Sequence, residues 1–360
     1  MTALRIYAGP AAREQIRQHG LRPADVRVIP GAAGGPKGLI LGPLDRFIFG
    51  DWLAGSTHEV HLVGASIGAW RLATACLNDK VAAFERLEHD YIHQSYELPP
   101  GRKRPTAEHV SERFGQSLQD FYGGRIGEVL NHPRWRLHIL CSRGRHMLGR
   151  EHGLRTPLGY LGAALANAVH RKAMGAWLER VVFSVPGAQL PFRSDDYRTR
   201  RVELNAANFM PALQASCSIP FVLKAIHDIA GAPPGAYWDG GIIDYHLHLN
   251  YAPARPGLVL YPHFQKAVVP GWLDKALKWR HKSTAFLDNV VLLAPSPEWV
   301  ASLPHGRLPD RNDFVRYGTD HAARSAVWTE AVRRSQELAA EFAQWLALGP
   351  DARMRQVEAL

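Results

Sequence analysis

Two glycine-rich turns, each set between a short apolar run and a helix-forming stretch, constrain the fold of this chain more than any other feature. The first turn, at residues 31–38, follows an apolar run at residues 24–29, and the second, at residues 64–68, follows a run at residues 60–63. Alanine, leucine and other helix formers come after both turns. Strands that alternate with helices in this way form parallel sheets with helices packed on their faces. The sequence therefore predicts an α/β fold.

The second turn reads Gly-Ala-Ser-Ile-Gly and places Ser66 at a sharp bend between a strand and a helix. Such a bend crowds its flanking residues, and Gly64 and Gly68 fit there because they have no Cβ atom. A serine held on such a bend can act as a nucleophile. The alternative interpretation is a turn in which Ser66 only caps the following helix.

The first turn reads Gly-Ala-Ala-Gly-Gly-Pro-Lys-Gly and predicts a site for an anion. The backbone N–H groups of Gly34 and Gly35 can turn toward one point because no side chain obstructs them, and the N–H of Ile67 can add a third donor at the start of a helix. Together they would form an oxyanion hole beside Ser66. The alternatives are a plain turn or a phosphate cradle. A Walker P-loop is excluded because Pro36 replaces its second glycine and no Ser or Thr follows the lysine.

A third motif, Asp239-Gly240-Gly241, follows an Ala-Tyr-Trp run and supplies a candidate general base. Because the ordinary pKa of a carboxyl group is near 4, Asp239 must lie in a poorly solvated place to accept a proton usefully at neutral pH. Seen alone, the motif also suits a β-turn. Three such motifs in this order arise by composition about once in ten thousand sequences, so we interpret them as one site.

These motifs resemble those of the patatin-like phospholipase family. The loop matches at Gly34, Gly35, Lys37 and Gly38, the serine turn at Gly64, Ser66 and Gly68, the aspartate motif at Asp239, Gly240 and Gly241, and a fourth block at residues 215–220, Ala-Ser-Cys-Ser-Ile-Pro. The chain departs from the family at Ala33, where a third glycine is common, and at residues 244–248, where Asn-x-Pro often follows the aspartate motif.

The resemblance implies a three-layer α/β/α sandwich with a mostly parallel central sheet. It also implies a Ser66–Asp239 dyad that works without histidine and hydrolyses acyl esters of lipids or phospholipids through an acyl-enzyme, as a phospholipase A-type hydrolase with no cofactor and no metal. Lys37 would either attract an anionic head group or brace the loop, and we favour bracing. Trp70, Trp177, Trp238 and Trp272 would line a lipid pocket or fill the core, and we favour the core.

We expect one domain over residues 1–360, because no linker, repeat or low-complexity segment is recognisable. Its motif-bearing core spans about residues 24–330, with a helical insert at 81–130 and a long amphipathic helix at 320–346. A further helix is expected at residues 157–178. The weakly polar part of that stretch, residues 157–169, is too short to span a bilayer.

The formal net charge is +10, with local concentrations of arginine and lysine at residues 102–104, 143–150 and 198–201. We expect most of these charges to be solvated; a transient contact with an anionic membrane surface is the second interpretation. Nucleic-acid binding is not expected, because no zinc-finger, helix-turn-helix or RNP signature accompanies them. The sequence carries no signal for an oligomeric state.

The three cysteines, Cys76, Cys141 and Cys217, are far apart in apolar segments and have no metal-ligand spacing. They indicate buried thiols in a reducing compartment. Since neither a signal peptide nor a membrane-spanning segment is recognisable, we expect a cytoplasmic protein, with peripheral membrane contact as a further option.

Two other functions remain open from the sequence. The first is an α/β-hydrolase with a Ser-Asp-His triad, in which His246, His248, His263 or His321 would complete the site. The second is a lipid- or acyl-binding protein without catalysis, which is less favoured because it would not need both Ser66 and Asp239.

Overall fold

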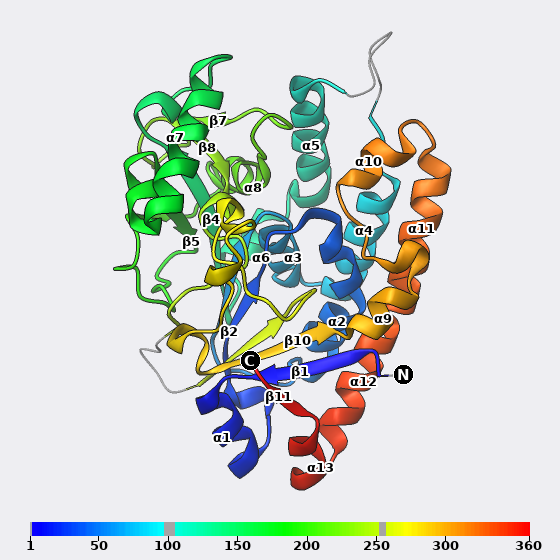
Figure 1. Ribbon diagram of the computed structural model, residues 1–360. Coiled ribbons are helices and arrows are strands. Elements are labelled where there is room, and N and C mark those ends of the chain that lie inside the picture. The colour runs from blue at the N-terminus through cyan, green and yellow to red at the C-terminus, as the bar shows by residue number, and fades with distance from the viewer. Residues whose placement is uncertain (1, 97–104, 252–256) are drawn as a thin grey trace.

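The computed structural model describes residues 2–96, 105–251 and 257–360, and in that part of the chain an eleven-stranded sheet forms the centre (Figure 1). The strands are β1 (Leu4–Ala8), β2 (Val26–Gly31), β3 (Val60–Ala65), β4 (Trp135–Gly144), β5 (Leu178–Ser184), β6 (Thr199–Glu203), β7 (Ile226–His227), β8 (Ala236–Asp239), β9 (Leu258–Pro262), β10 (Val290–Pro295) and β11 (Val357–Ala359). Their order across the sheet is β11-β1-β10-β9-β2-β3-β4-β5-β6, and β8 pairs with both β4 and β7.

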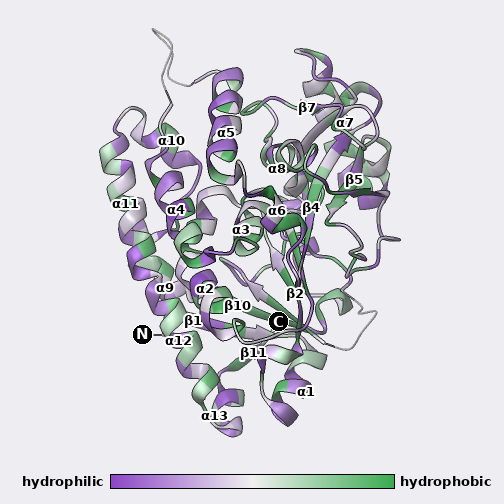
Figure 2. Cartoon of the chain, turned by 180° about the vertical axis from the view of Figure 1, so that it is seen from behind, coloured by the Kyte–Doolittle hydropathy of each residue, from purple (hydrophilic) through white to green (hydrophobic). Residues whose placement is uncertain are grey.

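The sheet is mostly parallel. The strands from β10 through β9, β2 and β3 to β4 run in one direction, whereas β4 is antiparallel to β5 and β8, and β1 is antiparallel to β10. Every residue of β5, β9 and β10 is buried, which requires cover on both faces of the sheet. Figure 2 shows hydrophobic residues along the central strands and more hydrophilic ones on the outer helices. The predicted α/β class, a mostly parallel sheet flanked by helices, is confirmed.

Helices flank this sheet (Figure 1). They are α1 (Pro10–His19), α2 (Gly42–Phe47), α3 (Ile67–Ala75), α4 (Lys80–His93), α5 (Ala107–Tyr122), α6 (Ile126–Leu130), α7 (Arg155–Val169), α8 (Phe209–Cys217), α9 (Pro297–Ser302), α10 (Asn312–Tyr317), α11 (His321–Arg334), α12 (Gln336–Ala347) and α13 (Pro350–Arg355). Helix α3 packs on β2, β3 and β4, and α8 packs on β4 and β8. These two helices therefore bring the serine turn and the 215–220 block to the same end of β4.

Two helix predictions need correction. The helix expected at residues 320–346 is two helices, α11 and α12, which meet at Ser335. The Ser335 hydroxyl donates to the carbonyl of Val332 and so competes with the regular helical ladder. The helix expected at residues 157–178 ends at Val169, because His170 is extended and its ring accepts the N–H of Lys172 to begin a separate short 3₁₀-helix.

The stretch predicted as a helical insert contains α4, α5 and α6. Helix α4 packs on α2, α3 and α11, and α5 packs on α8, so these helices contact the elements that carry the serine turn and the 215–220 block. The basic cluster at residues 102–104 lies outside the described residues.

Candidate active site

Ser66 lies at the turn between β3 and α3 in a backbone conformation that is rare for a residue with a side chain. Its φ is 56° and its ψ is −131°. The Ser66 N–H donates to Oγ of Ser216 at 2.9 Å, and Ser216 Oγ donates to the carbonyl of Leu140 at 2.7 Å. Strain of this kind persists only where neighbouring contacts hold it, and it clusters at functional sites. The sequence predicted the bend from its glycines, and Ser216 belongs to the Ala-Ser-x-x-x-Pro block.

The glycines around Ser66 allow two backbones to touch. A Cβ on Gly68 would overlap the carbonyl oxygen of Gly31, and a Cβ on Gly64 would overlap the backbone of Ala69. The first turn and the start of α3 are therefore in direct contact, as the pairing of β2 with β3 up to Gly31 and Gly64 also requires.

Asp239 is the last residue of β8, and its buried carboxylate lies against the Ser66 hydroxyl. Ser66 Oγ donates to Oδ2 at 2.8 Å, and the N–H of Gly241 donates to Oδ1 at 2.7 Å. Burial raises the pKa of Asp239 to about 6, although both hydrogen bonds and the positive charges of Arg311 and Lys275 lower it. A carboxylate with this pKa can take a proton from Ser66 near neutral pH.

The first turn lies on the other side of Ser66. Gly35 has a φ of 57° and begins a 3₁₀-helix, η2 (Gly35–Leu41), and Ile67 begins α3. The N–H groups of the first residue of a helix have no acceptor within that helix, so those of Gly35 and Ile67 are available to a ligand. Gly34 precedes them, and a Cβ there would stand 2.6 Å from the ring of Phe264. This arrangement can supply donors to an oxyanion at Ser66.

Lys37 lies near an aromatic ring, and Gly38 packs against the start of α3. The ammonium of Lys37 lies 5.5 Å from the centroid of the Phe264 ring, the same ring that packs against Gly34. Burial lowers the pKa of Lys37. A Cβ on Gly38 would stand 3.2 Å from the side chain of Ile67, so loop and helix are packed closely.

Gly240 and Gly241 let the aspartate turn pack against both other motifs. They begin a short 3₁₀-helix, η6 (Gly240–Ile242). A Cβ on Gly240 would overlap the carbonyl of Leu140, and a Cβ on Gly241 would stand 2.6 Å from the Cβ of Ala33 in the first turn. The three sequence motifs thus form one contiguous site.

A cavity with about 330 Å³ of empty space, part of it open to solvent, lies over Ser66 and Asp239. Its lining combines the three motifs with residues from other segments: Ala33, Gly34, Gly35, Ser66, Ile219, Pro220, Asp239, Gly241, Ile242, Tyr245, Trp272 and Arg311. Of the four tryptophans considered for a lipid pocket, Trp272 lines this cavity; Trp70 and Trp238 are buried, and Trp177 packs against Gly162 of α7.

Sequence reasoning missed two cations beside the cavity, Arg311 and Lys275. Among the described residues, neither has a carboxylate within ion-pair distance. The Lys275 ammonium lies 4.1 Å from the centroid of the Tyr245 ring, and burial, together with the charges of Arg311 and Lys37, lowers its pKa to about 8. Asp310 is the nearby acid, and it pairs with Arg307 at 3.8 Å. No motif marks these residues, which lie far downstream of Asp239.

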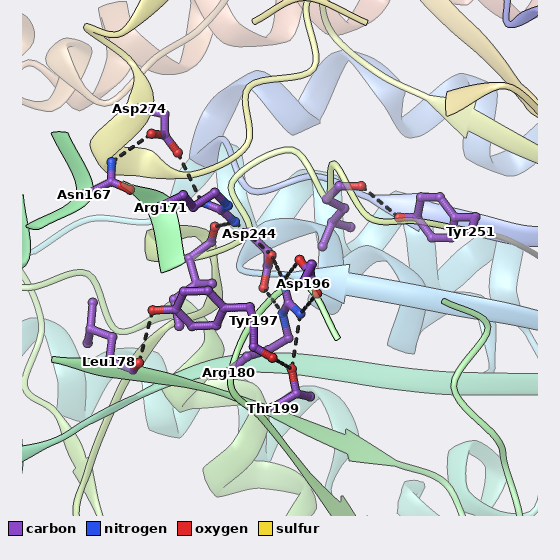
Figure 3. A network of polar contacts seen from close by, with 12 residues as sticks. Asn167, Arg171, Leu178, Arg180, Asp196, Tyr197, Thr199, Asp244, Tyr251 and Asp274 are labelled. Atoms are coloured by element: carbon purple, nitrogen blue, oxygen red, sulfur yellow. Dashed lines mark hydrogen bonds and ion pairs between the residues drawn. The ribbon is translucent and has the colours of Figure 1, made fainter. Parts of the chain in front are cut away.

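A buried network of arginines and aspartates fixes the chain beyond the aspartate motif (Figure 3). Arg180 donates to both carboxylate oxygens of Asp244 at 2.7 Å and to Asp196 at 2.9 and 3.0 Å. Arg171 joins Asp244 to Asp274, which precedes Lys275. The network therefore anchors both the turn that carries Asp239 and the segment that carries Lys275.

The histidines considered for a triad lie elsewhere. His246 bonds to Ala267 and Val269, His263 bonds to Gln265, and His248 bonds to Thr284. His321 is the half-buried first residue of α11 and lines a different cavity from the one over Ser66. Within the described ranges, no imidazole is hydrogen-bonded to Ser66 or to Asp239; the two side chains bond to each other directly.

The three cysteines are free thiols. Cys76 and Cys141 are buried, and burial raises the pKa of both. Cys217 as a whole residue is only partly buried, so the expectation of three buried thiols is wrong there. Cys217 lies next to the site, because it follows Ser216, whose Oγ accepts the N–H of Ser66. Burial also raises its pKa, so Cys217 stays a neutral neighbour of Ser66.

Comparison with known proteins gives low similarity. No family model matches the chain. No curated protein matches it either. Among solved structures, VipD from Legionella pneumophila is 12% identical, with a TM-score of 0.36 over 88% of this chain and 67% of that one. Human GIVD cytosolic phospholipase A2 is 11% identical, with a TM-score of 0.38 over 96% of this chain and 62% of that one. The chain thus spans about two thirds of the length of each.

Proposed function

We propose that this chain is a serine acyl hydrolase of patatin-like type that cleaves carboxylic ester bonds of lipids or phospholipids. The observation that carries the proposal is the 2.8 Å hydrogen bond from Ser66 Oγ to a buried carboxylate, Asp239, at the floor of a cavity. A strained serine with a base in contact is the arrangement that nucleophilic catalysis needs.

In the proposed reaction, Ser66 Oγ attacks the ester carbonyl carbon while Asp239 takes the hydroxyl proton. The N–H groups of Gly34, Gly35 and Ile67 stabilise the oxyanion that forms. Asp239 then gives the proton to the departing alkoxide, and the alcohol leaves an acyl group on Ser66. A water molecule, deprotonated by Asp239, hydrolyses this acyl-enzyme and restores the serine.

The direct bond between Ser66 and Asp239 supports a dyad over a Ser-Asp-His triad. A triad requires an imidazole between the serine and the carboxylate, because the histidine is the group that takes the proton. Here the carboxylate occupies that position, and its raised pKa of about 6 suits it to the role of base.

The cations beside the cavity favour an anionic ester as substrate. Lys37, Lys275 and Arg311 lie close enough for Arg311 to lower the pKa of both lysines. Three positive charges this close together repel one another, and among the described residues no carboxylate pairs with Arg311 or Lys275. A phosphate or carboxylate group of the substrate would reduce this repulsion. We therefore expect an ester whose alcohol part carries a negative charge, such as the head group of a phospholipid.

A fluorophosphonate probe tests the nucleophile. The folded protein should be labelled once, at Ser66, and Ser66→Ala should abolish both labelling and hydrolysis of p-nitrophenyl esters. Ser142→Ala is the matched control, because Ser142 is also buried near Asp239 but its hydroxyl has no hydrogen-bond partner among the described residues. Labelling that survives Ser66→Ala, or a folded protein that is never labelled, would overturn the proposal; the second outcome would favour a binding protein.

A further inference from the structure

Helix α7 exposes a row of large aliphatic side chains that nothing in the described structure covers. Leu154, at its N-cap, is 75% exposed, and Leu158, Leu161, Leu165 and Val169 are 57, 57, 63 and 85% exposed. Their spacing of three and four residues places them on one side of the helix, and we call these five residues the α7 face. A helix at a protein surface ordinarily carries polar residues on its outer side.

The inner side of α7 is apolar as well, which explains why the helix stays docked. Tyr160 and Ala163 are buried, and the Tyr160 ring lies 6.0 Å from that of Trp238, the residue before Asp239. Asn167 donates to Asp274 in the buried network. The helix is thus held firmly to the site while its other side faces outward, at the end of the molecule opposite α1 and α13 (Figures 1 and 2).

The apolar surface continues from α7 toward the cavity. Phe221 is 59% exposed, has a φ of 67°, and places its ring 5.8 Å from that of Tyr160. Val222 beside it is 46% exposed. The two residues before Phe221, Ile219 and Pro220, line the cavity over Ser66. Phe221 and Val222 therefore place exposed apolar side chains directly after two residues that line the cavity.

The surroundings of the α7 face are cationic. Residues 145–172 contain five arginines and lysines but one acid, Glu151. Glu151 is paired with Lys224, Arg150 with Asp228, and Arg171 with Asp244 and Asp274. Arg155 and Lys172, at or just beyond the two ends of the helix, are exposed and have no ion-pair partner among the described residues. Aliphatic residues flanked by cations are the pattern of helices that lie in the interface of an anionic bilayer.

We propose that the α7 face, with Phe221 and Val222, docks this protein on an anionic lipid surface, with α7 parallel to the membrane plane. Of the helices in the described ranges, none combines the length and apolar character that crossing a bilayer requires, so the contact is peripheral. The proposal concerns binding and stands whether or not Ser66 is catalytic.

A second copy of the chain fits this surface less well. Pairing two α7 faces would bring two cationic rims together, which like-charge repulsion opposes. The row also consists of leucine and valine, whereas protein interfaces draw their binding energy from tryptophan, tyrosine and arginine, and leucine is under-represented there. A bilayer can bury aliphatic side chains without a surface of complementary shape or composition.

Vesicle co-sedimentation tests the proposal. Ser66→Ala protein, which leaves the lipid intact, should bind phosphatidylglycerol-containing vesicles and bind phosphatidylcholine vesicles at least tenfold more weakly. Leu158→Gln/Leu165→Gln in the same background should weaken binding at least tenfold. The matched control is Val315→Gln on α10, because Val315 is also 57% exposed but lies outside the α7 face; it should bind as the parent does.

The charged rim is tested separately. Arg155→Gln/Lys172→Gln should weaken binding to the anionic vesicles by roughly five- to 25-fold, since each basic residue near such a surface contributes roughly fivefold. The loss should shrink as salt is added.

Three results would overturn the proposal. The first is that the parent protein does not bind vesicles. The second is that Leu158→Gln/Leu165→Gln binds vesicles as tightly as its parent does. The third is that light scattering shows a dimer of the parent protein and a monomer of the double variant, while vesicle binding is the same for both. With Ser66 restored, the double variant should still hydrolyse soluble p-nitrophenyl butyrate at the wild-type rate. If no variant hydrolyses any ester but vesicle binding follows the α7 face, the proposed function fails and the docking surface stands.

Discussion

Ser66 and Asp239 are 173 residues apart in the chain, and they meet because their strands end against consecutive residues of β4. Ala65, the last residue of β3, pairs with Leu140, and Asp239, the last residue of β8, pairs with Cys141. β3 is parallel to β4 and β8 is antiparallel to it, so the two strands approach each other end to end. The sheet itself therefore sets the distance between the proposed nucleophile and its base.

This geometry predicts a pH profile with two limbs. Asp239 must be ionised to accept the proton from Ser66, so kcat/KM should fall about tenfold for each pH unit below about 6. Lys275 loses its charge above pH 8. For an anionic ester, kcat/KM should therefore fall again above about pH 8, whereas a neutral ester should show the lower limb alone. Lys275→Gln should remove the upper limb; if the limb persists in that variant, another group causes it.

Asp239→Asn should inactivate the protein and yet stabilise it at neutral pH. Burial raises the carboxyl pKa from 3.8 to about 6, so the folded state binds the proton more tightly than the unfolded state does. The free energy of unfolding of the wild type must then decrease as pH rises from well below 3.8 to well above 6, by about 3 kcal/mol in total from this group, and stay lower above that range. Asparagine does not titrate, so the free energy of unfolding of the variant does not undergo this decrease as pH rises.

Urea denaturation at pH 4.5 and pH 7.5 measures the difference directly. The free energy of unfolding of Asp239→Asn, relative to the wild type, should rise by about 2 kcal/mol between the two pH values. Subtracting the wild type at each pH removes the titration of all other groups. A constant difference would show that the pKa of Asp239 is not raised by folding.

Gly68→Ala should damage the site through one added methyl group. The new Cβ would overlap the carbonyl oxygen of Gly31, so the first turn and α3 must separate, and with them the N–H donors and Ser66. Overpacking of this kind typically costs about 1–3 kcal/mol. We expect a lower melting temperature and at least a hundredfold loss in kcat. Gly153→Ala is the control, because no atom lies within 4 Å of a Cβ there; it should match the wild type in both measurements.

The parts of the site that sequence predicted are those that local backbone geometry dictates. Gly64 and Gly68 predict a crowded bend, and Asp-Gly-Gly predicts a tight turn directly after the carboxylate. These steric requirements act within five residues, so they select residue types at a spacing that is recognisable in the sequence. The hydrogen bond from Ser66 to Asp239 depends on which strands flank β4. The co-occurrence of the three motifs, together with the family resemblance, predicted that the two residues belong to one site.

The remaining features depend on long-range packing. Arg311 lines the cavity, and Lys275 packs on Tyr245 of its lining. Both belong to segments that follow most of the sheet, and a single cation on a loop leaves no pattern in the sequence. The helix break at Ser335 depends on a hydrogen bond from the Ser335 hydroxyl to the Val332 carbonyl. The spacing of apolar residues carries no information about such a bond. The exposure of Leu158 was also unpredictable, because its stretch is apolar on both sides and periodicity cannot tell a covered side from an open one.

Arg311→Gln should separate substrate recognition from chemistry. Arg311 lines the cavity, and its Cγ would stand 3.4 Å from a Cβ on Gly35. Its guanidinium has no ion-pair partner among the described residues. If it binds the negative group of the substrate, its loss removes a charged hydrogen bond that contributes about 1.5–3 kcal/mol. KM for an anionic ester should then rise roughly ten- to hundredfold, while kcat and the KM for p-nitrophenyl butyrate change less than twofold. Arg316→Gln, an exposed arginine on the neighbouring helix, should leave all four constants unchanged. An equal rise in KM for the anionic and the neutral ester would mean that Arg311 shapes the cavity and does not recognise charge.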